Sequence, residues 1–381
     1  MHSPTLPPED PHYSLVSCPN AGCHLGGHRG ADNLVHRSWT GKDQHIARLR
    51  CQAWGQEFSE RRGTLLAGST RPEETVERLR KCQRWGVCDA GTADICRVDI
   101  TTGHRFQTVA APRAQAPHEQ VPCALPAEGV QLDERPSKRR GPRVEWRHTA
   151  SARRRRFVLW VHWGPRTQAR AARLIAQVVA RLCGLPVWLS DGWKAYPAAL
   201  WHVLGRVSQR RRRGTRGRHP QPSLVPPHAL FYAQVVKVRD GAGTRLHVVP
   251  RVVYGGPRRF VLEMAGRGLR PSIQTACMER WYGTLRGLCA PLRRRTRCSS
   301  ASQHRHQARS WLVVARDTFV LPQRSLRHQG RPRTPALAVG LAAQVWSDRD
   351  YLWYPVHPDP LGRQLMPQRV KELLVPALEA G

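Results

Sequence analysis

Acidic residues and lysine are both scarce in this chain of 381 residues. Asp and Glu number 27 against 62 Lys and Arg, which gives a formal net charge of +35 at pH 7. This imbalance excludes the evenly charged surface of an ordinary metabolic enzyme and favours a polyanionic partner such as nucleic acid. Nearly all the basic residues are arginine, which suits phosphate recognition, although a GC-rich genome would produce the same bias.

Long apolar runs and regular cysteine pairs are missing as well. No stretch of 18 apolar residues exists, so we expect no membrane-spanning helix. Residues 1–17 are rich in proline and lack the basic flank and apolar stretch of a signal peptide, so we predict a disordered N-terminus. Eleven cysteines are an odd number, which disfavours a secreted disulfide scaffold. We therefore expect a cytoplasmic protein, associated with the nucleoid, that has neither a membrane partner nor a small-molecule substrate.

The chain length favours two or three domains, and the local patterns suggest where they begin. Residues 18–66 are rich in cysteine and histidine. Residues 70–107 predict short helices, the first with Thr70 as a candidate N-cap and an acidic first turn. Residues 108–129 contain several Pro and Ala without clear periodicity, which predicts a linker.

After the predicted linker, the pattern changes to one of alternating strands and helices. Gly241-Ala242-Gly243 between two β-branched runs predicts a β-hairpin. The other expected elements are strands at 130–134, 144–150, 157–163 and 185–192, and helices at 168–184, 272–289 and 304–320. This succession is typical of an α/β fold with helices flanking a sheet.

Three acidic residues stand out in a chain with few of them. Asp133 sits at the end of the predicted strand at 130–134, Asp191 follows the letters VWLS (187–190) of another predicted strand, and Glu279 lies on a predicted helix. Carboxylates on three elements could hold two Mg²⁺ ions, because hard cations prefer oxygen ligands. Two such ions can activate a water or a 3′-hydroxyl and stabilise the leaving oxygen of a phosphodiester. Taken singly, an Asp after a strand is more often a turn or cap residue.

The sequence segments around these acids resemble those of a known family. The stretches are VQLDE (130–134), SDGWKAYPAAL (190–200), IQTACMERWYGTLR (273–286), RRRTRCSS (293–300) and RTPALAVGLAAQVWS (333–347). Their order and spacing resemble those of insertion-sequence-one-like DDE transposases. The resemblance implies a ribonuclease-H-like catalytic core at 130–330, a tail at 331–381, and Mg²⁺ or Mn²⁺ held by catalytic Asp133, Asp191 and Glu279. It also implies that the protein acts as a homo-oligomer and that its partner is double-stranded DNA, both the element ends and the target.

The N-terminal region resembles the zinc-binding segment of the same family. Cys18, Cys23 and Cys51 match three of its four cysteines, and Trp54 stands at the fourth position. Zinc prefers four tetrahedral ligands, which His24, His28, His36 or His45 could complete. The alternative is a ribbon that has lost its metal and is held together by packing alone.

Residues 70–107 occupy the place of the family's helix-turn-helix, which lays its second helix in the major groove of DNA. Thr102 and Arg105 of that segment are candidate DNA contacts, unless the segment is only a helical connector. Arg280 and Arg286 share the Glu279 helix and could contact the scissile phosphate or its flank. Two basic runs could neutralise phosphates or be solvated surface: Arg210, Arg211, Arg212 and Arg213, and Arg293, Arg294 and Arg295.

Some family positions differ in this sequence. RPSKRRGPR (135–143) replaces the family's aromatic-rich stretch, and Gln323 replaces its histidine. These departures are typical of a divergent branch or a decaying gene copy. The alternative function is therefore a catalytically inactive or domesticated DNA-binding protein of the same fold. An arginine-rich RNA-binding protein is a further rival, disfavoured by the ordered acidic motifs.

Overall fold

The computed structural model describes most of the chain, in segments. These are residues 13, 16–20, 22–41, 46–119, 125, 128–138, 144–208, 221–239, 246–293 and 302–354. The chain divides into two compact units, Met1–Val121 with Thr284–Leu361 and Pro122–Gly283 with Gly362–Gly381. Residues 284–330, which the sequence analysis places in the catalytic domain, therefore group with the N-terminal unit.

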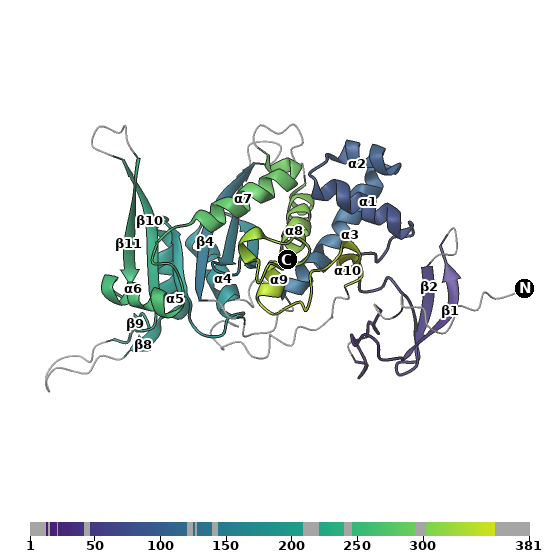
Figure 1. The fold of residues 1–381 in the computed structure, drawn as a ribbon, viewed down its shortest axis with the longest axis horizontal. Coiled ribbons are helices and arrows are strands. Elements are labelled where there is room, and N and C mark those ends of the chain that lie inside the picture. The colour runs from purple at the N-terminus through teal and green to yellow at the C-terminus, as the bar shows by residue number, and fades with distance from the viewer. Residues whose placement is uncertain are drawn as a thin grey trace, which may run out of the picture. The chain divides into compact units, whose positions relative to one another are not determined.

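The N-terminal unit begins with a small antiparallel sheet, coloured purple in Figure 1. Its strands are β1 (Leu34–Thr40), β2 (Ile46–Cys51) and β3 (Glu57–Ser59). Leu49 and Phe58 are directly paired across β2 and β3, and both are buried. Val16 is 2% exposed in the same core, so the prediction of a disordered segment over 1–17 is wrong at its C-terminal end. Residues 1–12, 14 and 15 lie outside the described part of the chain.

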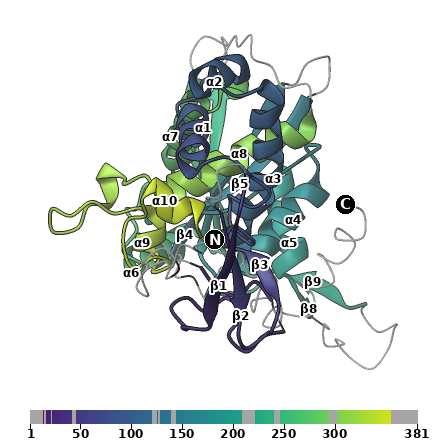
Figure 2. The same ribbon diagram turned by 90° about the vertical axis from the view of Figure 1, so that its right-hand side faces the viewer.

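Helices form the rest of this unit (Figure 2). They are α1 (Glu73–Arg84), α2 (Asp89–Cys96), α3 (Ile100–Glu119), α8 (Gln303–Phe319), α9 (Pro335–Ala338), α10 (Asp348–Leu352) and the short η2 (Ala290–Leu292) and η3 (Arg324–Leu326). The three predicted helices between residues 70 and 107 are confirmed in order, except that Pro72, not Thr70, precedes α1.

The predicted linker at 108–129 is wrong for its first half. Helix α3 continues to Glu119 and includes Pro112. Ala110 and Ala114 are fully buried in a core that contains Leu312 and Ala315 of α8. Alanine side chains are small enough to let two helices approach closely, and this tertiary packing outweighs the local cost of proline.

The predicted tail at 331–381 is partly built into the same unit. Leu352 and Trp353 are almost fully buried in the core that contains the N-terminal sheet. The backbone N–H of Leu65 donates to the Leu352 carbonyl at 3.1 Å. Residues 355–381 lie outside the described part of the chain.

The second unit is built on a six-stranded mixed sheet. In spatial order its strands are β11 (Leu246–Tyr254), β10 (Phe231–Arg239), β7 (Val187–Asp191), β4 (Gly129–Lys138), β5 (Val144–Ala152) and β6 (Val158–Gly164). The strands β4, β5 and β6 form an antiparallel meander, β7 runs parallel to β4, and β10 runs parallel to β7. The predicted strands and the hairpin of β10 and β11 are confirmed.

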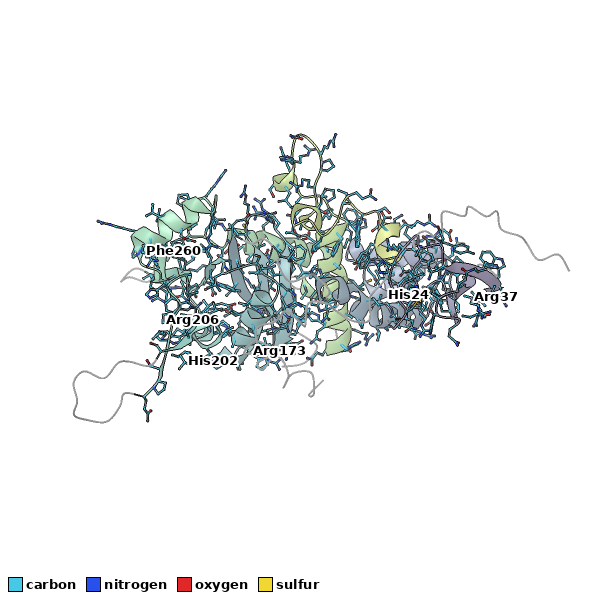
Figure 3. All side chains as sticks on the ribbon, turned by 90° about the horizontal axis from the view of Figure 1, so that it is seen from below. His24, Arg37, Arg173, His202, Arg206 and Phe260 are labelled. Atoms are coloured by element: carbon cyan, nitrogen blue, oxygen red, sulfur yellow. The ribbon has the colours of Figure 1, made fainter. Side chains whose placement is uncertain are left out.

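Helices flank this sheet on both faces, as Figure 1 shows. They are α4 (Gln168–Val179), α5 (Ala195–Leu204), α6 (Pro257–Gly266) and the first half of α7 (Ala276–Leu288), and a separate hairpin pairs β8 (Arg206–Ser208) with β9 (Ser223–Val225). Tyr254 donates a hydrogen bond to a carbonyl of α5. On α6, Phe260 (labelled in Figure 3) and Met264 pack on Leu189 of β7. The chain is therefore mixed α/β, with the sheet buried between helices.

No helix among the described residues combines the length and apolar character that a bilayer crossing requires.

Candidate functional site

Two of the predicted acidic residues meet in the middle of the six-stranded sheet. Leu132 of β4 pairs with Ser190 of β7 in parallel register, so Asp133 and Asp191 follow at the same level on neighbouring strands. After β4 the chain forms β5 and β6 on one side, then crosses to β7 on the other. Ligand sites of open α/β sheets lie outside the carboxyl ends of the strands at such a reversal point.

Glu134 joins this pair, which the sequence analysis did not foresee. One carboxylate oxygen from each of Asp133, Glu134 and Asp191 lies within 4.8 Å of the other two. Adjacent residues of a strand point to opposite faces, so Glu134 reaches the group from the α5 side. In the sequence, only the position of Glu134 directly after Asp133 indicated that it could join the group. The alternation of side chains along a strand disfavoured it, because neighbouring residues point to opposite faces.

Two side chains fix the Glu134 carboxylate. Arg166 donates to Oε1 through Nε at 3.0 Å and Nη2 at 2.7 Å, and Tyr196 donates to Oε2 at 2.7 Å. The Arg166 guanidinium also contacts the rings of Trp146 and Trp193, 4.7 and 4.9 Å from their centroids. This arrangement holds the side chain of Glu134 in one place and compensates its charge.

Burial raises the proton affinity of all three carboxyl groups. Burial raises the pKa of Asp133 to about 7, Arg135 opposes the change, and repulsion from Asp191 adds to it. Burial and the Asp191 charge raise the pKa of Glu134 to about 7, against the hydrogen bonds from Tyr196 and Arg166. Burial also raises the pKa of Asp191, although the Trp193 N–H donates to its Oδ1. Crowded buried carboxylates of this kind gain most from a bound cation.

Glu279, the third predicted catalytic acid, does not belong to this group of oxygens. It is exposed in the first turn of α7. Tyr282, one turn further on, donates from its hydroxyl to the backbone carbonyl of Asp133 at 3.2 Å. The start of α7 therefore lies beside β4, and the Glu279 charge contributes to the raised pKa of Asp133. The structure thus brings Asp133 and Asp191 together and leaves Glu279 near them with a solvated side chain.

The predicted DNA-binding arginines have different surroundings. Arg280 is exposed and Arg286 is half-buried, both on α7. Arg293 donates to the backbone carbonyls of Trp85 and Gly287, so its guanidinium is occupied by local structure. The remaining members of the two basic runs lie outside the described residues: Arg210, Arg211, Arg212, Arg213, Arg294 and Arg295.

The three predicted zinc-binding cysteines come together in the N-terminal unit. Their sulfur atoms all lie within 4.8 Å of one another, and Cys23 and Cys51 are 4.0 Å apart. The Trp54 N–H and the Asn33 side-chain amide donate to Cys51 Sγ at 3.4 and 3.1 Å. N–H donors of this kind stabilise a thiolate, the form of cysteine that binds metals.

The two buried thiols of this group differ in acidity. Burial raises the pKa of the Cys18 thiol to about 12. Burial acts on Cys51 in the same direction, but hydrogen bonds from Trp54, Cys18 and Asn33 outweigh it and lower its pKa. Cys51 is therefore more easily deprotonated than Cys18.

No described histidine joins the three sulfur atoms. His24 (labelled in Figure 3) and His28 are exposed, and His36 packs on Trp39 with ring centroids 4.7 Å apart. His45 lies outside the described residues. The fourth ligand position therefore has no occupant among the side chains that the structure describes.

The two candidate contacts of the helix-turn-helix segment lie on α3. Thr102 is half-buried in its first turn, and Arg105 is exposed one turn later. Both line a cavity between α1, α3 and the preceding loop.

No family model matches the chain, and no curated protein matches it either.

Proposed function

We propose that this protein is a DDE-type DNA transposase that cleaves and joins DNA with divalent metal ions. The observation that carries the proposal is the pairing of Asp133 and Asp191 at one level of neighbouring parallel strands. A basic chain with net charge +35 concentrates DNA phosphates near this acidic group, which could not hold a polyanion by itself.

The strand order supports a ribonuclease-H-like core. Strands β6, β5 and β4 form an antiparallel meander, and β7 and β10 extend it on the other side in parallel. Helix α7 follows the last strands and carries Glu279 beside β4. A core of this type holds two acids on strands and a third on a later helix, and the order of Asp133, Asp191 and Glu279 fits that scheme.

The carboxylate group fits a hard divalent cation such as Mg²⁺ or Mn²⁺. Its donors are all oxygens, and Arg135 and Arg166 offset only part of their mutual repulsion, so a bound cation would reduce it further. Asp133 and Asp191 would hold the ions, and Glu279 has a long exposed side chain able to turn toward them. When bound, the ions would supply activation of the attacking oxygen and stabilisation of the leaving one.

The reaction consists of two phosphoryl transfers. Water attacks the phosphorus at the element end, the bond to the 3′ oxygen breaks, and that oxygen leaves as a 3′-hydroxyl after taking a proton. The same 3′-hydroxyl then attacks a phosphodiester of the target and displaces its 3′ oxygen. Arg280 and Arg286 on α7 would contact phosphates and so position the DNA strands. Arg166 would keep the Glu134 side chain in place during the reaction.

The N-terminal unit would bind the terminal inverted repeats of the element. Cys18, Cys23 and Cys51 fit a soft cation such as Zn²⁺, with the fourth position open to a ligand from outside the group. Helices α1 to α3 would supply the helix-turn-helix. Two element ends must be cut and joined to one target, which implies a homo-oligomer on DNA.

Strand transfer on a donor DNA with the element's own ends tests the proposal. The wild-type protein should nick and join DNA with Mg²⁺ or Mn²⁺, and Asp191→Asn should abolish both steps without weakening DNA binding. Glu263→Gln, which removes a carboxylate on α6 in the same unit, should retain activity. Full activity of Asp191→Asn would remove that residue from the mechanism.

One observation favours the alternative of an inactive DNA-binding protein. Arg135 lies 3.4 Å from Asp133 Oδ2, and Arg166 and Tyr196 occupy both oxygens of Glu134. The carboxylates are thus partly compensated by the protein's own cations. This alternative predicts salt-sensitive DNA binding with no cleavage in any divalent metal.

A further inference from the structure

A cavity of about 190 Å³ lies within the N-terminal unit, apart from the carboxylate and thiol groups. Its walls are the loop before α1, helix α1 and the first three turns of α3. The volume is below the roughly 300–1,000 Å³ of drug-sized ligand pockets, so the walls can enclose one flat ring system while the rest of an occupant lies at the rim.

The lining divides into an apolar floor and a basic rim. Val76, Leu79 and Phe106 are buried and form the floor. Arg71 and Arg105 are exposed at the rim, and neither makes an ion pair within the part of the chain that the structure describes. An occupant that satisfies both surfaces has a flat apolar body and an anionic group.

The loop wall of the cavity is held in place from beneath. Arg61 is 3% exposed and donates through Nη1 to the carbonyls of Ser69 at 2.9 Å and Arg71 at 2.6 Å. On the opposite wall, Thr102 lies in the first turn of the 20-residue helix α3, where the helix dipole is positive. The cavity is therefore a preformed site whose electrostatics favour an anion.

We propose that this cavity binds one nucleotide, with the base on the floor against Phe106 and the phosphate between Arg71 and Arg105. Aromatic side chains stack on any base, and arginine forks match phosphate oxygens. The hydroxyls of Ser69, Thr70 and Thr102 can hydrogen-bond the base edge, which an aliphatic chain would leave unsatisfied. The nucleotide could be free in solution or extruded from a DNA strand. The proposal does not depend on the metal chemistry of the other unit.

Calorimetric titration of the full chain tests the proposal with thymidine 5′-monophosphate and deoxyadenosine 5′-monophosphate. We expect each to bind at least tenfold more tightly than thymidine or inorganic phosphate. Arg105→Gln should weaken binding at least fivefold and Val109→Phe, which fills the cavity, should abolish it. Arg78→Gln removes an exposed arginine of α1 that does not line the cavity and should change nothing.

Several results would overturn the proposal. They are an absence of binding, equal binding of phosphate alone, tighter binding of benzoate or decanoate, and unchanged binding by Val109→Phe. If circular dichroism shows that Val109→Phe does not fold, Val109→Ala replaces it. Unchanged nucleotide affinity in both Val109→Ala and Arg105→Gln would then overturn the proposal.

A single-stranded oligonucleotide containing 2-aminopurine separates the two sources of the nucleotide. A change in its fluorescence that mononucleotides compete away and that Arg105→Gln reduces assigns the site to a base of a DNA strand. Mononucleotide binding without any such change assigns it to a free nucleotide.

Discussion

Asp133 and Asp191 occupy neighbouring positions on the parallel strands β4 and β7, one residue beyond the pair Leu132 and Ser190. Because the register is parallel, both side chains leave the sheet on the same face and at the same level. Hydrogen bonds of the central sheet, and not a loop, therefore set their separation. Glu134 lies within the same group of oxygens although it comes from the other face.

Metal affinity should depend on pH. Burial raises the pKa of Asp133 and of Glu134 to about 7, so protons compete with a cation for these oxygens around neutrality. We expect Mn²⁺ binding to tighten from pH 6 to pH 8, as measured by electron paramagnetic resonance of the free ion. Asp133→Asn should weaken binding at least tenfold, and Glu263→Gln should not. An affinity independent of pH would contradict the assignment.

Stability in the presence of a chelator should fall as the pH rises. The folded pKa of Asp133 lies above its unfolded value of 3.8, so its contribution is complete below about pH 4 and is lost as the pH passes through 7. The loss should amount to a few kcal/mol, since a tenfold change in proton affinity corresponds to about 1.4 kcal/mol. Thermal unfolding between pH 5 and 8.5 should show a decline that Asp133→Asn reduces. An unchanged slope in that variant would show that other groups dominate.

Removal of Arg166 should destabilise the second unit. Arg166→Gln leaves the Glu134 carboxylate, whose side chain is 1% exposed, without its cation. We expect a loss of about 2–3 kcal/mol in urea unfolding, less than for a fully buried pair because the Arg166 side chain is 38% exposed. Adding Glu134→Gln to Arg166→Gln should recover part of this loss.

Arg154→Gln is the matched control for Arg166. Arg154 is 60% exposed and lies 3.7 Å from Glu128, so its removal should cost less than about 0.5 kcal/mol. If Arg166→Gln and Arg154→Gln lower the free energy of unfolding equally, the ion pair of Glu134 and Arg166 contributes no more to stability than an exposed pair.

Introducing a cysteine at position 54 should strengthen zinc binding. The turn after Cys51 keeps its N–H donor from residue 54, and Gly55 has the positive φ of 78° that a tight turn needs. Trp54→Cys should therefore place a fourth thiolate near the other three and lower the zinc dissociation constant at least tenfold, as measured by chelator competition. Cys51→Ser should release zinc. Equal affinity of wild type and Trp54→Cys would show that the fourth position is already filled or misplaced.

Local patterns predicted most of the secondary structure. The predicted strand at 144–150 and the predicted pairing of the runs before and after Gly241–Gly243 depend on neighbouring residues, and both form where expected, as β5 and as the pair β10 and β11. Gly241–Gly243 lie outside the described residues. The predicted strand at 130–134 continues to Lys138 because Arg135 to Lys138 pair with β5, although their polar sequence resembles a loop. Helix α3 likewise extends over a stretch without periodicity, because Ala110 and Ala114 are buried in the core shared with α8.

For the candidate site, the sequence by itself selected Asp133, Asp191 and Glu279, because the segments around these three acids resemble the acidic motifs of a known family. Only the tertiary structure decided which oxygens meet. Strand register placed Asp133 and Asp191 side by side, and contacts with Arg166 and Tyr196 from other elements drew in Glu134. Glu279 on α7 is exposed and lies outside this group of oxygens. Periodicity along a chain is a local property, whereas the convergence of side chains depends on packing between segments far apart in sequence.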